Sequence, residues 1–368
     1  TNAGSRALEG YVALEDATAV SRLRHAGATL CGSARMSELC FGLQGDTIAE
    51  VFTSEKAHIG LITDTMGEAR LAAAASGIFG FKPSFGIVSR FGLIGLVPSM
   101  ECCGIIAKTI EEIIDTIGVI AGSDERDFSM ADEPLPDFRK AKEPVNTPGV
   151  AGIIKECCES LTGKEETAFK AGISKLEGAG LRVQELSFQD FNLFRVVHNV
   201  IGSVEASSSA GKYDGVRYGH RSVSGMNWNE MYLNSRGESF GTLIKSYLFQ
   251  GAYFQFENYS SFEDACRIRG RLVREMENLL KEVDMLVFPT RKLTSDASEA
   301  STINETYDAF SLTVPANVTG QPSLHIPRIA EESGADVGLQ VLGSRGRDAR
   351  LLSFGMKLSS LCKGVKRE

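Results

Sequence analysis

Apolar residues recur along the chain at helical spacing in some segments and at strand spacing in others. Residues 110–117 place four isoleucines on one helical face, and Thr109-Ile110-Glu111-Glu112 has the spacing of a capping box. Helices are likewise predicted over 17–26, 36–41, 165–178, 190–210, 228–232, 240–253, 264–281 and 348–361, and an alanine-rich helix near 65–76 that Asp64 could cap. Short apolar runs predict strands at 28–31, 58–63, 150–154, 181–186, 284–288, 323–326 and 337–342.

The order of these segments predicts the fold class. Strands that alternate with helices are typical of an α/β protein with helices layered on a sheet. Residues 123–148 are rich in Asp, Glu and Pro, which predicts a surface loop. Length alone would allow two domains, but large sheets of this class often form one, so we expect a single domain over 1–368.

Composition mainly excludes classes of function. The chain is 43% hydrophobic and 23% charged, as ordinary globular proteins are. Its net charge of −8 argues against direct nucleic-acid binding, which needs a basic surface. No apolar run approaches the ~18 residues of a membrane-spanning helix, so no transmembrane segment is expected. Neither a targeting segment nor a Met stands at Thr1, which suggests a processed chain or one incomplete at its start.

The cysteines and histidines show no metal-binding pattern. Four of the eight cysteines form the adjacent pairs 102–103 and 157–158, and the five histidines are scattered, without a His-Glu-x-x-His motif. We therefore expect no metal and no cofactor, and we interpret the cysteines as reduced thiols that pack as small hydrophobic side chains.

Several segments resemble one family. Residues 60–70, GLITDTMGEAR, resemble the amidase signature GSDTGGSIR, and further runs match at 11–42, 81–122, 205–221, 307–322 and 337–343. The chain is identified as a member of the amidase signature family, most similar to the A subunits of glutamyl-tRNA(Gln)/aspartyl-tRNA(Asn) amidotransferases (GatA). The run 205–221, EASSSAGKYDGVRYGHR, follows a segment that separates these subunits from general amidases. The resemblance implies an α/β/α layered fold with a mixed, twisted central sheet, whose N-terminal part is missing here.

The resemblance also places the family's functional positions. The nucleophilic serine is replaced by Glu68, and a carboxylate cannot be activated by a base as a serine hydroxyl is. Asp64, Thr65 and Gly67 of the signature loop are retained, which helix-terminus geometry alone would explain. The family's catalytic lysine would precede residue 1, and its Gly-Ser loop has no counterpart in 42–59.

Two substrate-binding positions differ as well. Tyr247 stands where the family has the arginine that binds the substrate carboxylate, although a phenol lacks the guanidinium's bidentate geometry. Phe310 replaces the aspartate that holds the substrate amine. We expect Tyr247 and Phe310 to fill the former substrate pocket, and Glu68 to accept hydrogen bonds from the backbone of the signature loop.

These replacements predict that the chain is not an enzyme but an inactive relative, a structural or accessory subunit of a larger complex of proteins. The family's habits suggest a mitochondrial location, with a plastid as the alternative, and a respiratory-chain or ribosomal complex. A second interpretation is a subunit that performs glutamine-dependent amide transfer with Ser54, Lys56 or Ser76 as replacement groups, or with a segment supplied by another chain. A third is a regulator paired with the other amidotransferase subunits.

Overall fold

The chain folds around one mixed sheet, as expected. The computed structural model describes residues 1–54, 57–130, 132–143, 145, 149–329, 331–332 and 334–362. Eight strands form the main sheet in the order β1-β3-β2-β7-β10-β6-β4-β5. Their bounds are β1 (Ile59–Asp64), β2 (Phe79–Lys82), β3 (Cys102–Ala107), β4 (Val150–Ile154), β5 (Arg182–Leu186), β6 (Met285–Pro289), β7 (Ser323–Ile326) and β10 (Leu339–Leu342). β4 lies parallel to β5 and β6, whereas the other pairs are antiparallel.

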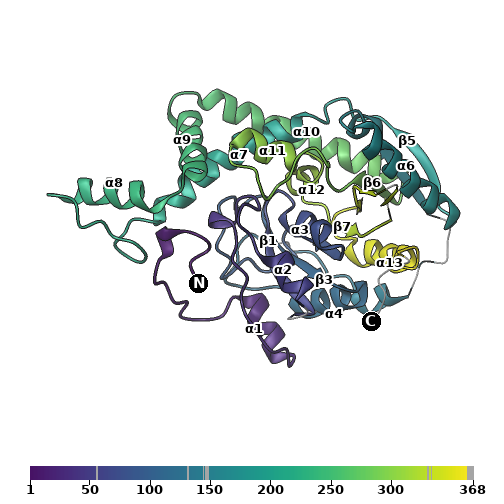
Figure 1. The fold of residues 1–368 in the computed structure, drawn as a ribbon, viewed down its shortest axis with the longest axis horizontal. Coiled ribbons are helices and arrows are strands. Elements are labelled where there is room, and N and C mark those ends of the chain that lie inside the picture. The colour runs from purple at the N-terminus through teal and green to yellow at the C-terminus, as the bar shows by residue number, and fades with distance from the viewer. Residues whose placement is uncertain are drawn as a thin grey trace.

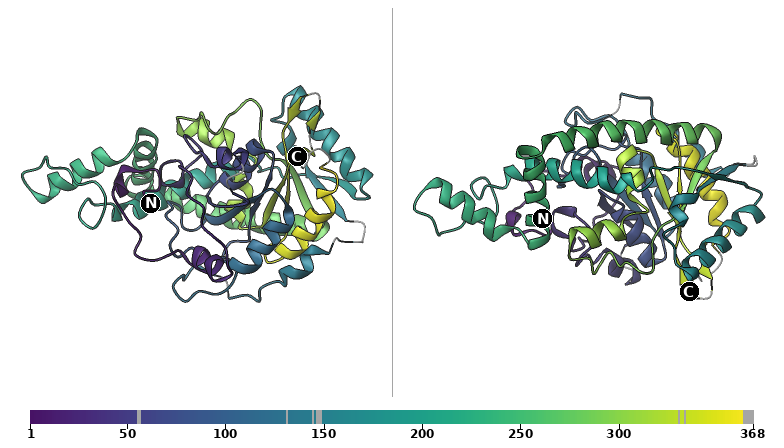
Figure 2. Two further views of the ribbon diagram at one scale, coloured as in Figure 1. Left: turned by 60° about the horizontal axis from the view of Figure 1, so that its bottom comes forward. Right: turned by 90° about the horizontal axis from the view of Figure 1, so that it is seen from above.

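Helices cover both faces of this sheet (Figures 1 and 2). Within the described residues they are α1 (Thr18–His25), α2 (Ile48–Thr53), α3 (Glu68–Ser76), α4 (Ile110–Ile120), α5 (Lys155–Cys158), α6 (Gly163–Gly178), α7 (Leu193–Ser209), α8 (Trp228–Ser239), α9 (Thr242–Phe256), α10 (Tyr259–Glu282), α11 (Ile303–Ala309), α12 (Val314–Thr319) and α13 (Asp348–Ser359). The short strands β8 (Glu331–Glu332) and β9 (Ala335–Asp336) form a separate pair, and the short 3₁₀ helices are η1 (Arg6–Leu8), η2 (Glu38–Cys40), η3 (Phe138–Lys142) and η4 (Ala210–Lys212).

The strand period of two divides the interior into two apolar cores. Along β6, Leu286 and Phe288 point into a core shared with α3, α7, α9 and α10, while Met285 and Val287 point into one shared with α4, α6 and α13. This alternation confirms the three-layer α/β/α arrangement. The capping box at Thr109 is also present, because its hydroxyl accepts the N–H of Glu112 and the Glu112 carboxylate accepts the N–H of Thr109.

Some local predictions were wrong. Residues 28–31 are exposed and form no strand, since no neighbouring strand pairs with them. β2 and β3 were missed, because glycines and adjacent cysteines weaken their strand pattern. Within residues 123–148, η3 buries Phe138 and Ala141, and residues 131, 144 and 146–148 lie outside the described part, so that the surface loop stays a prediction. A single domain over 1–368 stays a prediction.

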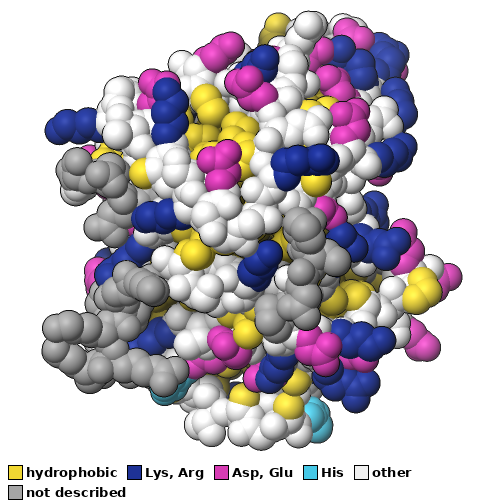
Figure 3. Space-filling view, turned by 90° about the vertical axis from the view of Figure 1, so that its right-hand side faces the viewer, with side chains coloured by type: hydrophobic (Ala, Val, Ile, Leu, Met, Phe, Trp, Pro, Cys, Tyr) yellow, Lys and Arg dark blue, Asp and Glu magenta, His cyan; other side chains and the backbone are white. Residues whose placement is uncertain are grey.

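Thiols and charges complete the description of the surface. All eight cysteines are free, but Cys31 and Cys266 are exposed and therefore do not act as buried hydrophobes. Where α6 and β5 lie, side chains of both charge signs are interspersed (Figure 3). None of the helices in the described residues has the length and apolarity needed to cross a membrane.

Candidate functional site

The signature segment forms a tight strand-to-helix turn. β1 ends at Asp64 and α3 begins at Glu68, so that Thr65, Met66 and Gly67 make the turn. Gly67 has φ of 130°, and a Cβ there would collide with the hydroxyl oxygen of Thr313. Only glycine fits this position without strain, because left-handed backbone disfavours a side chain and the space is already taken.

Glu68 turns its side chain back onto this turn. Its Oε2 accepts the backbone N–H groups of Thr65, Met66 and Gly67 at 2.7, 2.8 and 3.1 Å, and its Oε1 accepts the N–H of Gly42 at 3.2 Å. The side chain is buried. The expected hydrogen bonds to the loop backbone are therefore confirmed, and they satisfy donors that the start of a helix leaves free.

The environment of Glu68 favours its protonated form. Burial, and then the nearby Asp64 carboxylate, raise the pKa of Glu68 to about 8, although the backbone N–H groups act in the opposite direction. Three donors converge on Oε2 and only one reaches Oε1. Oε1 is therefore the oxygen with fewer hydrogen-bond donors.

Asp64 does not cap α3, contrary to expectation, since Gly67 is the N-cap residue. Its carboxylate instead pairs with the guanidinium of Arg70 at 3.0 Å, and neither side chain is exposed to solvent. Arg70 also donates to the carbonyl of Thr313 and to the amide oxygens of Asn317 and Gln340. Burial would raise the pKa of Asp64, but the Arg70 guanidinium holds it below its ordinary value. Each buried charge thus has an opposite charge and hydrogen-bond partners, without which its burial would be strongly destabilising.

A chain of hydrogen bonds leads from the turn to Tyr247. Burial lowers the pKa of His198 to about 4, so the ring is neutral. Its Nε2–H donates to the carbonyl of Thr65 at 3.0 Å, which leaves Nδ1 to accept the hydroxyl of Tyr307 at 2.8 Å. The Tyr247 hydroxyl then donates to that of Tyr307 at 2.8 Å.

Tyr247 and Phe310 are both buried in the apolar core that also contains Phe41. The Tyr247 ring centroid lies 4.3 Å from that of Phe41. Phe310 caps the end of α11, and its carbonyl accepts the N–H of Thr313. That these two positions are degenerate substrate-binding sites stays a prediction, as does the interpretation of Glu68 as a degenerate nucleophile position.

Two of the proposed replacement groups, Ser54 and Ser76, form hydrogen bonds away from the turn. Ser76 lies at the opposite end of α3 and donates to the carbonyl of Ala72, and the exposed Ser54 donates to that of Val51. Lys56 lies outside the described residues.

Sequence reasoning also missed residues that the turn depends on. Arg70, as the last residue of the signature segment, could have been found, whereas His198 carried no local signal.

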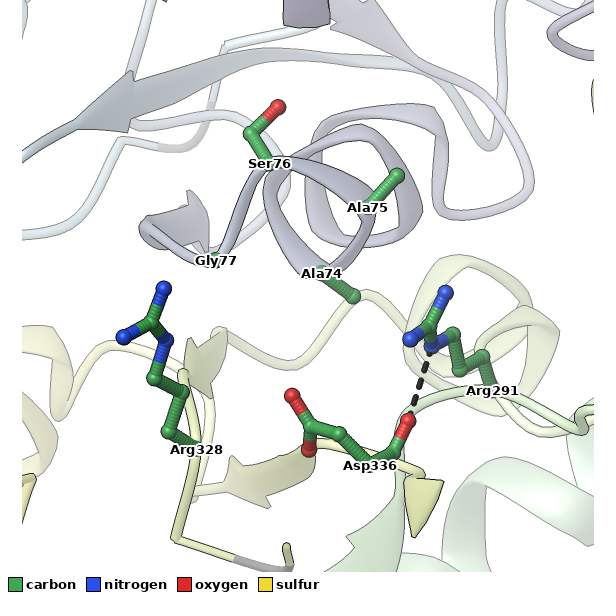
Figure 4. A pocket seen from close by; sticks show the side chains of 7 residues that line it. All are labelled: Ala74, Ala75, Ser76, Gly77, Arg291, Arg328 and Asp336. Atoms are coloured by element: carbon green, nitrogen blue, oxygen red, sulfur yellow. Dashed lines mark hydrogen bonds between the residues drawn. The ribbon is translucent and has the colours of Figure 1, made fainter. Parts of the chain in front are cut away.

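One cavity in the described residues lies away from the turn. It has a volume of about 370 Å³ and is formed by the C-terminal end of α3 together with Arg291, Arg328 and Asp336 (Figure 4). A second, of about 90 Å³, adjoins the start of α9 beside Glu38 and Phe41. No group of three or more His, Cys, Asp or Glu side chains in the described part could hold a metal ion.

Comparison with known proteins identifies the family. The Amidase family model matches residues 1–55 and 48–352. The A subunit of the glutamyl-tRNA(Gln) amidotransferase of Symbiobacterium thermophilum is 30% identical over 99% of this chain and 80% of its own length, and that of Halorhodospira halophila is 32% identical over 97% and 79%.

Solved structures agree on the fold. The crystal structure of the A subunit of the glutamyl-tRNA(Gln) amidotransferase from Thermotoga maritima superposes with a TM-score of 0.79, at 23% identity, over 97% of this chain and 79% of that one. The structure of 6-aminohexanoate cyclic dimer hydrolase gives 0.81 at 16% identity, over 100% and 82%. At these identities the likeness concerns the fold alone.

These findings correct one expectation. We expected the chain not to be an enzyme, but its relatives are named as amidotransferase subunits of an enzyme family, and nothing shows this chain to be inactive. With a family model that matches most of its length and relatives at 30% identity or more, the chain belongs to the amidase family.

Proposed function

We propose that this chain is a subunit of a multi-subunit protein assembly related to the one that its relatives' names describe, and that its role there includes a structural one carried by its surface. The partners that we propose are other proteins. The mixed surface charge and the net charge of −8 suit protein partners better than nucleic acid.

The observation that carries this proposal is the local structure of the run 205–221, which resembles a segment of the A subunits. Asp214 organises it as a turn, because its carboxylate accepts the N–H groups of Val216 and Arg217 and pairs with the Arg217 guanidinium at 3.0 Å. The turn lies at the surface, where Val216 is exposed. An ordered surface turn in a run that resembles the A subunits fits a role in contacting other subunits.

A second candidate function is glutamine-dependent amide transfer within such an assembly. It is supported by the relatives' names and by the signature turn, in which three backbone N–H groups converge on one point. Such convergent donors stabilise developing negative charge in acyl transfer. Here the point is occupied by Oε2 of Glu68, which would have to move for a substrate oxygen to take its place.

The test is purification of the tagged full-length chain from its native source, with identification of co-purifying proteins by mass spectrometry. We expect a stoichiometric set of partners. Arg217→Gln should lower their recovery, and Arg139→Gln is the matched control, because it also breaks an exposed arginine–aspartate pair, but on η3. A chain that elutes alone, or equal losses from both variants, would overturn the proposal.

The same preparation separates the two candidates. Ammonia release from glutamine above that of a preparation lacking the chain would support amide transfer, and partner binding without such release would support the structural role by itself.

We also propose a mitochondrial location, with a plastid as the alternative. The free cysteines suit a reducing compartment. Fractionation of organelles with an antibody to the chain tests this, and recovery in the cytosolic fraction would refute it.

A further inference from the structure

A helical arm projects from the body of the molecule. We define the arm as residues 213–239, which contain α8, and it extends away from the sheet in Figures 1 and 2. It carries an apolar cluster of five exposed side chains: Val223 (100% exposed), Met226 (94%), Trp228 (58%), Tyr232 (37%) and Leu233 (71%). The Trp228 and Tyr232 rings lie 5.9 Å apart, centre to centre, and exposed apolar side chains concentrated on one element mark a binding site more often than chance.

Hydrogen bonds hold the arm together internally and at its root. The Asn227 side chain caps α8 by accepting the N–H of Glu230, and the Ser235 hydroxyl accepts the N–H of Ser222. At the root of the arm, Arg236 donates to the carbonyls of Ala210 and Tyr213. A rigid arm loses little conformational entropy on docking, which favours affinity.

A second exposed apolar surface lies on α9. Phe249, Tyr253 and Phe256 are spaced by four and three residues, so they share one helical face, and they are exposed by 76, 53 and 75%. We call this face the α9 stripe. The other side of α9 is held tightly against α7, where a Cβ at Gly251 would collide with the carbonyl of Ser203. The stripe therefore cannot be hidden by a rotation of the helix.

The two surfaces together are large enough for a stable dimer. The five aromatic side chains of the cluster and stripe, at about 200 Å² each and at their observed exposures, present about 600 Å² per chain. A two-fold interface that covers them on both chains would bury about 1,200 Å² from the aromatic residues alone, which reaches the size of specific interfaces.

The charges beside the two surfaces are complementary. In the arm, the exposed Arg221 guanidinium lies 5.5 Å from the ring centre of Trp228. Beyond the end of the stripe, the exposed carboxylates of Glu257 and Glu263 follow Phe256. If the arm docks on the stripe with Trp228 next to Phe256, Arg221 lies near the carboxylates of Glu257 and Glu263. This charge pairing favours that one orientation of the arm on the stripe.

We propose that two copies of this chain associate about a two-fold axis, with the arm of each protomer seated on the α9 stripe of its partner. Each arm–stripe contact then occurs twice, as two-fold symmetry requires.

Sedimentation equilibrium of the purified full-length chain tests this proposal. We expect a dimer with a dissociation constant in the micromolar range or tighter. Leu233→Asp in the arm and Phe249→Asp in the stripe should each raise that constant at least about 30-fold. Phe128→Asp is the control, because Phe128 is 98% exposed but lies outside both surfaces. All three positions are exposed, and unchanged thermal unfolding will verify that the variants are folded.

A mixture of the arm and stripe variants gives the decisive measurement. In a mixed dimer, one contact joins a native arm to a native stripe, so the mixture should dimerise more tightly than either variant alone. A chain that stays monomeric at about 100 μM, a dimer that neither variant weakens, or a mixture without recovery would overturn the proposal. Monomers whose arm and stripe become protected only when a different protein of the assembly is added would show that this protein is the occupant instead.

Discussion

Replacing Glu68 by glutamine should change how the stability of the protein depends on pH. In the native protein the pKa of Glu68 is raised from its ordinary value of 4.5 to about 8. The folded state therefore holds this proton more tightly than the unfolded state, and the resulting stabilisation is complete below pH 4.5 and is lost as pH rises through 8. Glutamine has no proton to lose, so Glu68→Gln removes this dependence.

The size of the effect follows from the shift. One pKa unit corresponds to about 1.4 kcal/mol. As pH rises, the free energy of unfolding of the native protein can therefore fall by at most about 5 kcal/mol relative to that of the variant. The variant also has a cost that does not depend on pH, because its NH₂ group would face the N–H of Gly42 and leave that donor unpaired, at about 1–3 kcal/mol. Only the pH-dependent part tests the argument.

Urea denaturation at several pH values between 5 and 8.5 measures this difference from the midpoints and slopes. From pH 5 to pH 8.5, the free energy of unfolding of the native protein should fall by at least about 1.4 kcal/mol relative to that of Glu68→Gln. Glu165→Gln is the matched control. Burial would raise the pKa of Glu165, but hydrogen bonds from the Thr162 and Leu293 backbone lower it. The contribution of Glu165 to stability therefore changes with pH only below pH 4.5, outside the range measured. A stability difference that is flat, or that grows with pH, would refute the reasoning for Glu68.

Three further substitutions test the construction of the turn. Arg70→Met leaves the buried Asp64 carboxylate unpaired and should lower the free energy of unfolding by about 3–5 kcal/mol, measured by urea denaturation, and a loss below about 1 kcal/mol would contradict the buried pair. Gly67→Ala, which needs a strained φ of 130° and occupied space, should lower the melting temperature by more than Gly178→Ala in α6, where a Cβ meets nothing within 4 Å. Tyr247→Phe removes the donor to the Tyr307 hydroxyl and should cost about 1 kcal/mol in the same denaturation assay, and an unchanged midpoint would argue against that hydrogen bond.

Local signals in the sequence were sufficient for much of the fold. The four isoleucines and the capping box at Thr109 determined α4, and the strand β7 at Ser323–Ile326 was predicted with its observed bounds. The resemblance at 60–70 located the turn and identified Glu68 as its central side chain. Such features depend on residues within a few positions of one another, so the sequence contains them in readable form.

Tertiary structure alone decided what surrounds the turn. Asp64 could have capped a helix, but it pairs with Arg70, whose other partners Thr313 and Gln340 are 243 and 270 residues away in the sequence. His198 reaches the carbonyl of Thr65 from a helix 133 residues away. These contacts exist because the order of strands in the sheet brings distant segments together, and burial among them sets the pKa of Glu68. The sequence by itself therefore determined where the turn lies and which side chain it holds, whereas packing between distant segments determined the protonation and the partners of that side chain.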